Sequence, residues 1–372
     1  MVVVLGRSEQ LSRLEIETTL KRSGRTIDDL TVTSGAAIVK AAPMPDTAWF
    51  RALGGARLFG VVEARVALNE TAIVHTLTDL IGTQAVIGLS QLGGDPMIVS
   101  LARTLKREIA SLKRYLLPSE GTLLSPVQSR ELESEWLLVQ AAGECLVVRV
   151  AAHQDIDEFT RRDRSLPVLD MKRGMLPTKL ARMMANIALG DQPLNPTTVV
   201  LDPFCGTGRL LIESLLLGSG VLGADIDPAA IAASVKNLTW AADTYHLASF
   251  DQDQLFAAPI DKVASLLSPA SLRAVATEPF LGPPALRAQT ANERDERFAT
   301  LAPQYEALLR ASQVLLEPGG RLVAVFPLIG DHSLFARFVD RLHGFGYHLL
   351  DSIPVIRSDQ WIARDIVVLE KQ

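Results

Sequence analysis

The stretch TTVVLDPFCGTGRLLIESLLLGSGVLGADIDPAAIAASVKNL, residues 197–238, decides the fold of the C-terminal half of this 372-residue chain. A β-branched apolar run at 198–201 predicts a strand. A turn that contains glycine separates it from a helical pattern over 209–217. A second short strand at 221–225 ends in Asp225. Strand, glycine turn, helix, strand and acid in this order predict a parallel βαβ unit that binds a nucleotide.

The turn carries the chemistry of this unit. Gly206 and Gly208 lack Cβ atoms, so the backbone can approach a ligand closely and adopt positive φ. The helix that follows offers free N–H groups, and an acid at the tip of the second strand can accept both hydroxyls of a ribose. The spacing is neither G-x-G-x-x-G nor G-x-x-x-x-G-K-[ST], which argues against a dinucleotide site and against a P-loop.

DPFCGTG at 202–208, followed by GADIDP at 223–228, resembles the S-adenosylmethionine site of class I methyltransferases, above all that of the THUMP-domain tRNA methyltransferases. The resemblance implies S-adenosyl-L-methionine as the cofactor. The residues that it assigns to the cofactor here are Asp202, Phe204, Cys205, Gly206, Thr207, Gly208, Asp225 and Ile226. Cys205 is expected to fill space rather than to act as a nucleophile. The alternative is a generic Rossmann turn without a ligand.

Two further segments extend the resemblance. GMLPTKL at 174–180 opens a predicted helix over 174–189, with Pro177 at its start. The resemblance implies that this helix closes the cofactor pocket, with Pro177 beside the cofactor. Asp251 stands where the family has the acid that receives the adenine amino group, with Asp253 as a substitute. A plain turn is the other interpretation of this second segment.

A predicted strand at 272–277 delivers the sequence Glu278-Pro279-Phe280-Leu281. Amino-group methyltransferases have [DN]-P-P-[YF] here, where the acid or amide orients an exocyclic amine and the ring stacks on the base. The resemblance therefore implies that Glu278 orients the amine and accepts its proton, that the Pro279 carbonyl assists and that Phe280 stacks. The chain departs from the motif, because glutamate is one methylene longer and Leu281 replaces the aromatic residue. Small displacements matter for group transfer.

The resemblance and the element pattern together predict an α/β fold. A Rossmann-like class I methyltransferase domain, a parallel sheet with an antiparallel last strand, is expected over 171–372. Its later elements are helices at 303–316 and 333–342 and strands at 347–355 and 365–370. Ahead of it we expect an N-terminal α/β segment at 1–45, a THUMP-like α+β RNA-binding domain at 46–155 and a linker at 156–170.

Two basic clusters are candidates for RNA contact. A predicted amphipathic helix over 95–115 has a basic face, and the linker carries three arginines. The residues are Arg103, Lys106, Arg107, Lys113 and Arg114 on the helix and Arg161, Arg162 and Arg164 in the linker. The alternatives are a solvated helix face and arginines that pair with neighbouring acids such as Glu158.

Composition sets the outer limits. The chain has 48% hydrophobic and 21% charged residues, a net charge of −5 and a pI of about 5.8, which indicate a globular protein of two or three domains. The acidic balance argues mildly against nucleic acid, although local basic clusters can still bind phosphate. The beginning, MVVVLGRSEQ, has no secretory pattern and no membrane span is evident, so a cytoplasmic location is expected. Two cysteines form no disulfide framework, and no metal-ligand spacing appears.

The resemblance thus implies an S-adenosylmethionine-dependent RNA methyltransferase whose substrate is tRNA and whose target atom is guanine N2. Two alternatives stay open: methylation of another amine, such as adenine N6 in RNA or DNA, and an RNA-binding protein of this fold with impaired catalysis. The need for a small activator protein and the oligomeric state are not encoded in these motifs.

Overall fold

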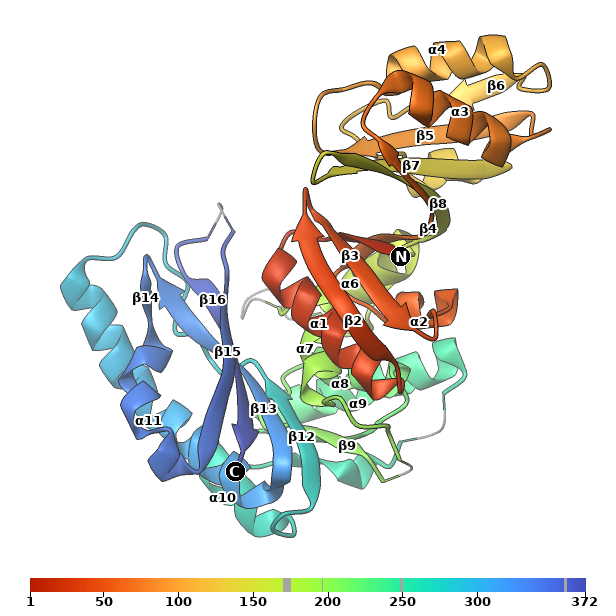
Figure 1. Ribbon diagram of the computed structural model, residues 1–372. Helices are drawn as coiled ribbons and strands as arrows, with labels where there is room; N and C mark the ends of the chain where they lie inside the picture. Colours follow the sequence, from red (N-terminus) through yellow and green to blue (C-terminus); the bar gives the residue numbers. More distant parts are fainter. Residues whose placement is uncertain (170–174, 196, 248–249, 358–359) are drawn as a thin grey trace. The chain divides into compact units, whose positions relative to one another are not determined.

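The computed structural model describes residues 1–169, 175–195, 197–247, 250–357 and 360–372. The chain forms two compact units (Figure 1). The N-terminal unit comprises Met1–Leu20 and Arg25–Ile156, and the C-terminal unit comprises Lys21–Gly24 and Asp157–Gln372. In the part of the chain that is described, every helix is too short or too polar to cross a membrane.

The N-terminal unit is built on one eight-stranded sheet in the order β2-β3-β1-β4-β8-β7-β5-β6. All neighbours are antiparallel except β5, which is parallel to β6 and β7. The strands are β1 (Val2–Leu5), β2 (Thr26–Thr33), β3 (Ala36–Ala42), β4 (Ala56–Ala67), β5 (Val86–Leu92), β6 (Arg114–Leu116), β7 (Ser134–Ala141) and β8 (Glu144–His153). The helices are α1 (Glu9–Arg22), α2 (Thr47–Arg51), α3 (Glu70–Ile81), α4 (Ile98–Glu108) and α5 (Pro126–Ser129).

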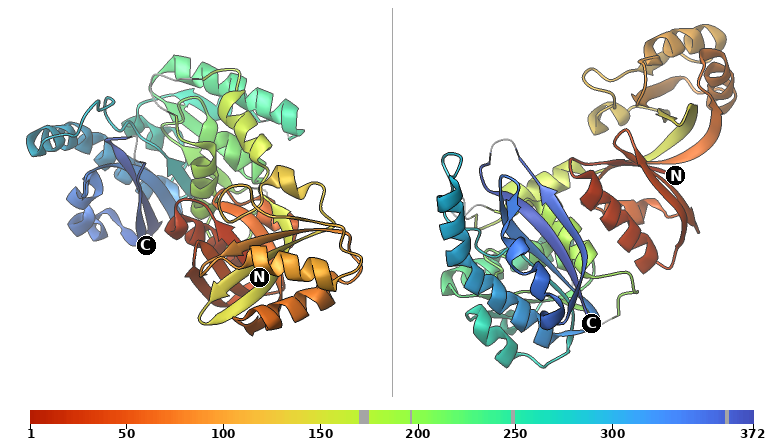
Figure 2. Two further views of the ribbon diagram at one scale, coloured as in Figure 1. Left: turned by 90° about the horizontal axis from the view of Figure 1, so that it is seen from above. Right: turned by 60° about the vertical axis from the view of Figure 1, so that its left-hand side comes forward.

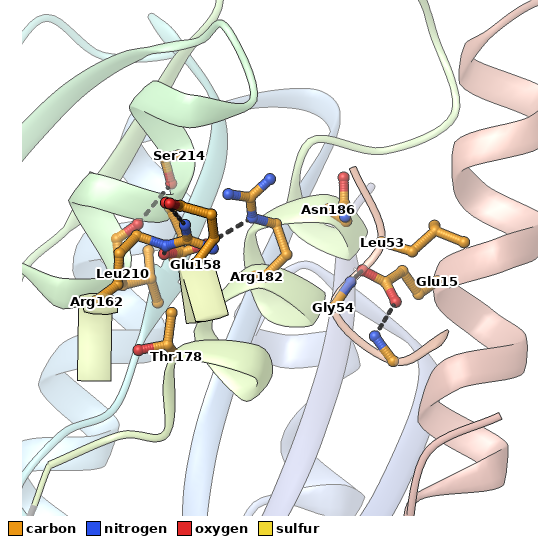
Figure 3. A network of polar contacts seen from close by, with 12 residues as sticks. Glu15, Leu53, Gly54, Glu158, Arg162, Thr178, Arg182, Asn186, Leu210 and Ser214 are labelled. Carbon is orange, nitrogen blue, oxygen red and sulfur yellow. Dashed lines mark hydrogen bonds and ion pairs between the residues drawn. The ribbon is translucent and has the colours of Figure 1, made fainter. Parts of the chain in front are cut away.

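Two of the hydrophobic cores on this sheet include helices, and a third is formed by strand residues such as Val4, Leu137 and Val148. One packs α1 and α2 against β1, β3 and β4, and the other packs α3 and α4 against β5, β7 and β8 (Figures 1 and 2). Because β1 pairs with both β3 and β4, the segment predicted at 1–45 shares its sheet with the next region. Buried Glu15 fixes the intervening turn, since its two carboxylate oxygens accept from Gly54 N and Gly55 N, each at 2.8 Å (Figure 3).

The helix predicted over 95–115 is wrong at its C-terminal end. α4 stops at Glu108, and Ile109 is extended with φ −96° and ψ 101°. The backbone N–H groups of Lys113 and Arg114 donate to Ala85 O at 2.8 and 3.0 Å, which starts the parallel pairing of β6 with β5. Ile109 remains buried. The helical spacing of apolar residues therefore persists in the sequence, while pairing at the sheet edge determines the backbone.

The C-terminal unit is the predicted Rossmann-like domain. Its sheet has the order β11-β10-β9-β12-β13-β16-β15, and β16 is antiparallel to both of its neighbours. The strands are β9 (Val199–Asp202), β10 (Gly220–Asp225), β11 (Leu255–Ala257), β12 (Leu272–Thr277), β13 (Leu316–Ile329), β14 (His332–Ser333), β15 (Tyr347–Val355) and β16 (Ala363–Lys371). The strand order reverses direction at β9 and β12, the place where open α/β sheets bind ligands.

Helices cover both faces of this sheet. α8 and α9 pack on one face, and α10 and α11 pack on the other. The helices are α6 (Ile156–Arg164), α7 (Thr178–Ala188), α8 (Arg209–Leu216), α9 (Pro228–Tyr245), α10 (Ile260–Leu266) and α11 (Ala291–Leu315). The predicted linker at 156–170 thus contains a helix, and the helix predicted at 333–342 is a series of 3₁₀ turns, η2 (Leu334–Arg337), η3 (Val339–Arg341) and η4 (His343–Phe345).

α11 begins twelve residues earlier than its predicted start at Pro303. Thr290 and Glu293 form a capping box there: Glu293 N donates to Thr290 Oγ1 at 3.3 Å, and Thr290 N donates to Glu293 Oε2 at 2.8 Å. The sequence signal T-x-x-E was present. The prediction failed because Pro303 was interpreted as a helix start, whereas it lies inside the helix.

Candidate active site

The predicted cofactor loop joins β9 to α8. Cys205 N donates to Ala224 O at 2.8 Å, which ties the loop to β10. Gly206 and Gly208 have φ values of +52° and +82°. A Cβ on Gly208 would lie 2.6 Å from both the Ser234 and the Leu238 side chains of α9, so glycine is required there by conformation and by helix packing. A Cβ on Gly206 would meet nothing within 4 Å, so the loop presents open space at that point.

Asp225 at the tip of β10 is held by the backbone of this loop. Its Oδ2 accepts from Gly206 N at 3.0 Å, and its Oδ1 accepts from Asp227 N at 2.9 Å. Each carboxylate oxygen can accept a further hydrogen bond. Asp225 therefore offers two fixed acceptors at the mouth of the glycine loop, which suits a pair of hydroxyl groups.

Asp202 at the end of β9 is fully buried in the same region. It accepts from Thr277 Oγ1 at 2.6 Å and from Phe204 N at 3.1 Å. Burial raises the pKa of Asp202 to about 7, although these two hydrogen bonds oppose the shift. Asp202 therefore changes charge near neutral pH.

Asp202→Asn is expected to make stability less dependent on pH. A carboxyl with a raised pKa resists ionisation in the folded state, so its contribution to stability falls as pH rises from 3.8, its ordinary pKa, to about 7. Asparagine keeps an acceptor oxygen but has no proton to lose. Relative to the parent, the free energy of unfolding of the variant should rise by up to about 1.4 kcal/mol per pH unit across this window. Urea denaturation at pH 5, 6, 7 and 8 measures the difference, and parallel pH curves for the two proteins would contradict the assignment.

Glu278 follows β12 and is paired with an arginine that the sequence analysis missed. Arg364 Nε, from β16, donates to Glu278 Oε1 at 2.6 Å, and the two side chains are only 10% and 14% exposed. Arg364 Nη1 also donates to Gln360 Oε1 at 3.3 Å. Arg364 is 86 residues away from Glu278 in the sequence, so no local motif predicts this pair. The pair fixes the orientation of the Glu278 carboxylate.

The segment after Glu278 is braced from α11. Arg297 Nη1 donates to Leu281 O at 3.3 Å and to Pro283 O at 2.8 Å. Gly282 between them has φ +90°, and a Cβ there would lie 2.2 Å from the Arg297 guanidinium. Phe280 is 56% exposed, so its ring is available for contact with a ligand.

One cavity of about 660 Å³ joins the glycine loop to the Glu278 segment. Of the predicted site residues, its lining includes Asp202, Phe204, Cys205, Gly206, Thr207, Asp225, Ile226, Glu278, Pro279 and Phe280. The lining residues that the sequence analysis missed include Leu176, Arg209, Asp227, Gln304 and Arg364. Among the charged lining residues, Arg209 forms an ion pair through its Nη1 with Asp163 Oδ1 at 2.6 Å. The carboxylate of Asp225 stands at the mouth of the loop, and its negative charge suits a cationic ligand.

Three predicted cofactor residues do not line this cavity. Gly208 shapes the loop from behind. Pro177 is the N-cap residue of α7, with ψ 137°, and therefore precedes the first helical residue. Asp251 is exposed and caps η1 (Gln252–Gln254) by accepting from Asp253 N at 3.0 Å. Contact of Pro177 and Asp251 with a cofactor stays a prediction. Gly174, with which the predicted helix opens, lies outside the described residues.

Asn237 is a further residue that the sequence analysis did not assign to the site. Its side chain accepts from Val168 N at 2.9 Å and donates to Val168 O and Thr207 O, each at 2.9 Å. Asn237 lies inside α9, which continues to Tyr245. The fully buried Asn237 amide links the cofactor loop to the chain before α7, whose Val168 lines the cavity.

The predicted RNA-binding residues differ in their surroundings. Arg162 is buried and pairs with Glu213 at 2.7 Å and Glu158 at 3.7 Å, so its side chain holds the C-terminal unit together instead of facing a ligand. Arg161 is exposed and also pairs with Glu158, at 3.3 Å. Arg164 is exposed. The expected pairing of linker arginines with local acids is thus present for Arg161 and Arg162, and Glu213 is an additional partner.

In the N-terminal unit, Lys106 Nζ donates to the carbonyl oxygens of Leu112 and Lys113, so it closes the turn after α4. Arg107 Nη2 donates to Thr104 Oγ1 at 3.2 Å, and Arg114 pairs with Glu131 at 2.9 Å. Arg103 and Lys113 are exposed. Because Lys113 and Arg114 follow the end of α4, the five basic residues do not form one helix face.

Residues 169–264 match the family model described as the RMKL-like methyltransferase domain. The C-terminal unit therefore resembles a class I methyltransferase domain. The match covers the glycine loop and Asp225, and the strand order around them is that of the predicted Rossmann-like fold. The expected resemblance to S-adenosylmethionine-dependent tRNA methyltransferases is confirmed.

Proteins similar to this chain come from archaea and bacteria. The tRNA (guanine(10)-N2)-dimethyltransferase of Methanothermobacter thermautotrophicus is 31% identical over 233 residues, which are 61% of this chain and 58% of that protein. The enzyme of the same name from Pyrococcus abyssi is 27% identical over 177 residues, 45% of this chain and 46% of its own length. The chain therefore spans about half of these curated relatives.

Among solved structures, the match with TrmN from Thermus thermophilus covers 100% of this chain and 99% of the TrmN chain, with a TM-score of 0.57 and 16% sequence identity. The match with a predicted N6-adenine-specific DNA methylase from Listeria monocytogenes covers 99% of this chain and 95% of the methylase chain, with a TM-score of 0.50 and 13% sequence identity. At these identities the two structures show that the fold is alike, and they carry no statement about activity or substrate.

Proposed function

We propose that this protein transfers the methyl group of S-adenosylmethionine to an exocyclic amine of RNA, with guanine N2 of tRNA as the target. The observation that carries the proposal is the single cavity that holds the glycine loop, Asp225 and Glu278 together. Both ends of the cavity lie at the carboxyl ends of β9, β10 and β12, where class I folds perform their chemistry.

The residues present fit this cofactor. Gly206 leaves open space beside the loop, and Asp225 offers fixed acceptors for ribose hydroxyls. When bound, the cofactor supplies an activated methyl group on a positively charged sulfur. The acidic loop suits that charge. Asp202, Phe204, Cys205, Thr207 and Ile226 complete this end of the cavity.

At the other end, Glu278 accepts a hydrogen bond from the target amine and turns its lone pair toward the methyl group. The bound cofactor would supply the methyl group, with its sulfur as the leaving group, and the Glu278 carboxylate accepts the proton that the amine nitrogen loses. The Pro279 carbonyl accepts the second amine hydrogen, and the exposed Phe280 ring stacks on the base. Most of the rate comes from this positioning.

The choice of tRNA rests on the relatives named above and on the THUMP-like interpretation of residues 46–155. The basic residues best placed to contact phosphate are the exposed Arg103, Lys113 and Arg164. Contact with phosphate by the other three arginines would first require them to break an existing hydrogen bond or ion pair; these are Arg107, Arg114 and Arg161. The proposal requires tRNA or another structured RNA as partner. The need for an activator protein is tested by adding cell extract to the transfer assay.

Asp225→Ala is expected to weaken binding of S-adenosylhomocysteine by about tenfold or more. The substitution removes both acceptors for the ribose and releases Gly206 N and Asp227 N, and each charged hydrogen bond contributes about 1.5–3 kcal/mol. Calorimetric titration of parent and variant gives the two dissociation constants. Asp261→Ala, which removes an exposed acid from α10, is the matched control. Equal affinity for Asp225→Ala and Asp261→Ala would remove Asp225 from the cofactor site.

Methyl transfer from radiolabelled S-adenosylmethionine tests the proposal as a whole. The expected result is label in bulk tRNA and little in duplex DNA of the same mass. Label in DNA alone would keep the enzyme and replace its substrate. Cofactor binding in the calorimeter without label in either nucleic acid, with or without added cell extract, would favour the RNA-binding alternative.

A further inference from the structure

The acceptor end of the cavity contains a hydrogen-bond donor without a partner. Gln304, on α11, lines the cavity together with Glu278 and Arg364. Its Nε2 atom is shielded from solvent and makes no hydrogen bond among the described residues. A buried amide nitrogen in this state costs about 1–3 kcal/mol relative to one that is paired. Such a cost is common at sites where a ligand supplies the missing partner.

The position of Gln304 on α11 places this donor near the reacting group. Arg297 braces the Leu281 and Pro283 carbonyls, and Gln304 is seven residues further along, on the same face of the helix. The next residue, Tyr305, is completely buried, and the charge of Glu278 contributes to raising its pKa after burial, so this turn of α11 lies close to Glu278.

The polar groups at this end have complementary roles. The Glu278 carboxylate can only accept, and Arg364 already satisfies one of its oxygens. Gln304 Nε2 can only donate. The side chains therefore offer an acceptor and a donor within one cavity, beside the exposed ring of Phe280. A base that presents an amine and, beside it, a ring nitrogen or carbonyl oxygen satisfies both.

We propose that Gln304 is a specificity-determining residue: its Nε2 donates to an acceptor atom of the target purine base while Glu278 holds the exocyclic amine. This inference rests on the proposed function and names the substrate class of the same site, an aminopurine with an acceptor next to its amine. A base without that acceptor leaves the Gln304 amide unpaired. The site therefore rejects such a base, because an unpaired buried polar group makes its binding unfavourable.

The test compares the parent with Gln304→Met, which keeps an unbranched side chain of similar length but removes the donor. We expect kcat/KM for tRNA to fall by about tenfold or more. The dissociation constant of S-adenosylhomocysteine should stay within about twofold of the parent. A second readout is independent of methyl transfer. Saturation-transfer NMR detects binding of guanosine 5′-monophosphate to the protein saturated with S-adenosylhomocysteine. The binding signal should be visible for the parent and weaker for the variant.

Gln313→Met is the matched control, because it makes the same change on the same helix outside the cavity lining. Parent-like values for Gln304→Met in both transfer and nucleotide binding would overturn the proposal. Weaker binding of S-adenosylhomocysteine in Gln304→Met would also overturn it, since the donor would then serve the cofactor. If the parent binds the nucleotide but transfers no methyl group, the proposed function fails while the nucleotide signal still decides the role of Gln304. Absence of nucleotide binding by the parent would overturn the role of Gln304.

Discussion

Glu278→Gln is expected to lower kcat for methyl transfer to tRNA by about 100-fold or more, with S-adenosylhomocysteine bound as tightly as by the parent. Glutamine keeps an oxygen that accepts from Arg364 Nε, so the pairing in the fold is preserved. It loses the negative charge that stabilises the amine as it becomes positive in the transition state, and it cannot take up the proton. Single-turnover kinetics with saturating tRNA separate this effect from RNA binding.

The control for this variant is Glu317→Gln, the same change at an exposed position of β13. It should retain the transfer rate of the parent. A Glu278→Gln protein that methylates tRNA as fast as the Glu317→Gln protein would show that the Glu-Pro-Phe-Leu segment does not perform the chemistry. Glu278→Ala is less informative, because it also leaves the buried Arg364 guanidinium without its carboxylate.

The second large effect concerns stability. Glu213→Ala is expected to reduce the free energy of unfolding of the C-terminal unit by about 3–5 kcal/mol. Glu213 is fully buried on α8, and its two oxygens bind Arg162 Nε at 2.7 Å and Arg182 Nε at 2.6 Å. The two arginines come from α6 and α7 (Figure 3). Without Glu213, two guanidinium groups that are 7% and 6% exposed lose their shared carboxylate.

Urea denaturation followed by tryptophan fluorescence measures this loss, and Arg161→Ala is its control. Arg161 forms an exposed pair with Glu158 at 3.3 Å on the same helix α6, so its removal should cost less than about 1 kcal/mol. Equal stability of the Glu213→Ala and Arg161→Ala proteins would mean that the buried triad contributes no more than a surface pair.

The triad also bears on the active site. α8 begins directly after Gly208, and α7 follows Leu176, which lines the cavity. Glu213 therefore joins α8, which follows the glycine loop, to α7, the helix expected to close the pocket. Arg209 adds a second link, since it donates to Leu176 O at 3.1 Å and to Asp163 Oδ1 at 2.6 Å.

The sequence was sufficient to predict the elements around the glycine loop and Asp225 because its signals there are local. Asp202, Gly206 and Asp225 lie within 24 residues of one another, and turn chemistry fixes their backbone whatever the rest of the fold does. β9, α8 and β10 accordingly begin and end within one residue of their predicted limits. The position of Glu278 was predictable for the same reason, since it directly follows a strand.

The acceptor end depends on contacts between distant segments. Arg364 reaches Glu278 from the last strand, and Gln304 lies inside a helix whose start was misjudged, so neither residue belongs to a motif. The role of Arg162 was ambiguous because its partner Glu213 is 51 residues away, and sequence proximity favoured nearer acids. Long-range pairing of buried charges is a property of packing and leaves no periodic trace in the sequence.

The most direct test of the central claim is mass spectrometry of the nucleosides from tRNA incubated with the protein and isotopically labelled S-adenosylmethionine. The account predicts labelled N2-methylguanosine, formed by the parent and reduced by about 100-fold or more with Glu278→Gln. Labelled N6-methyladenosine as the only product, or labelled N2-methylguanosine formed equally by both proteins, would contradict it.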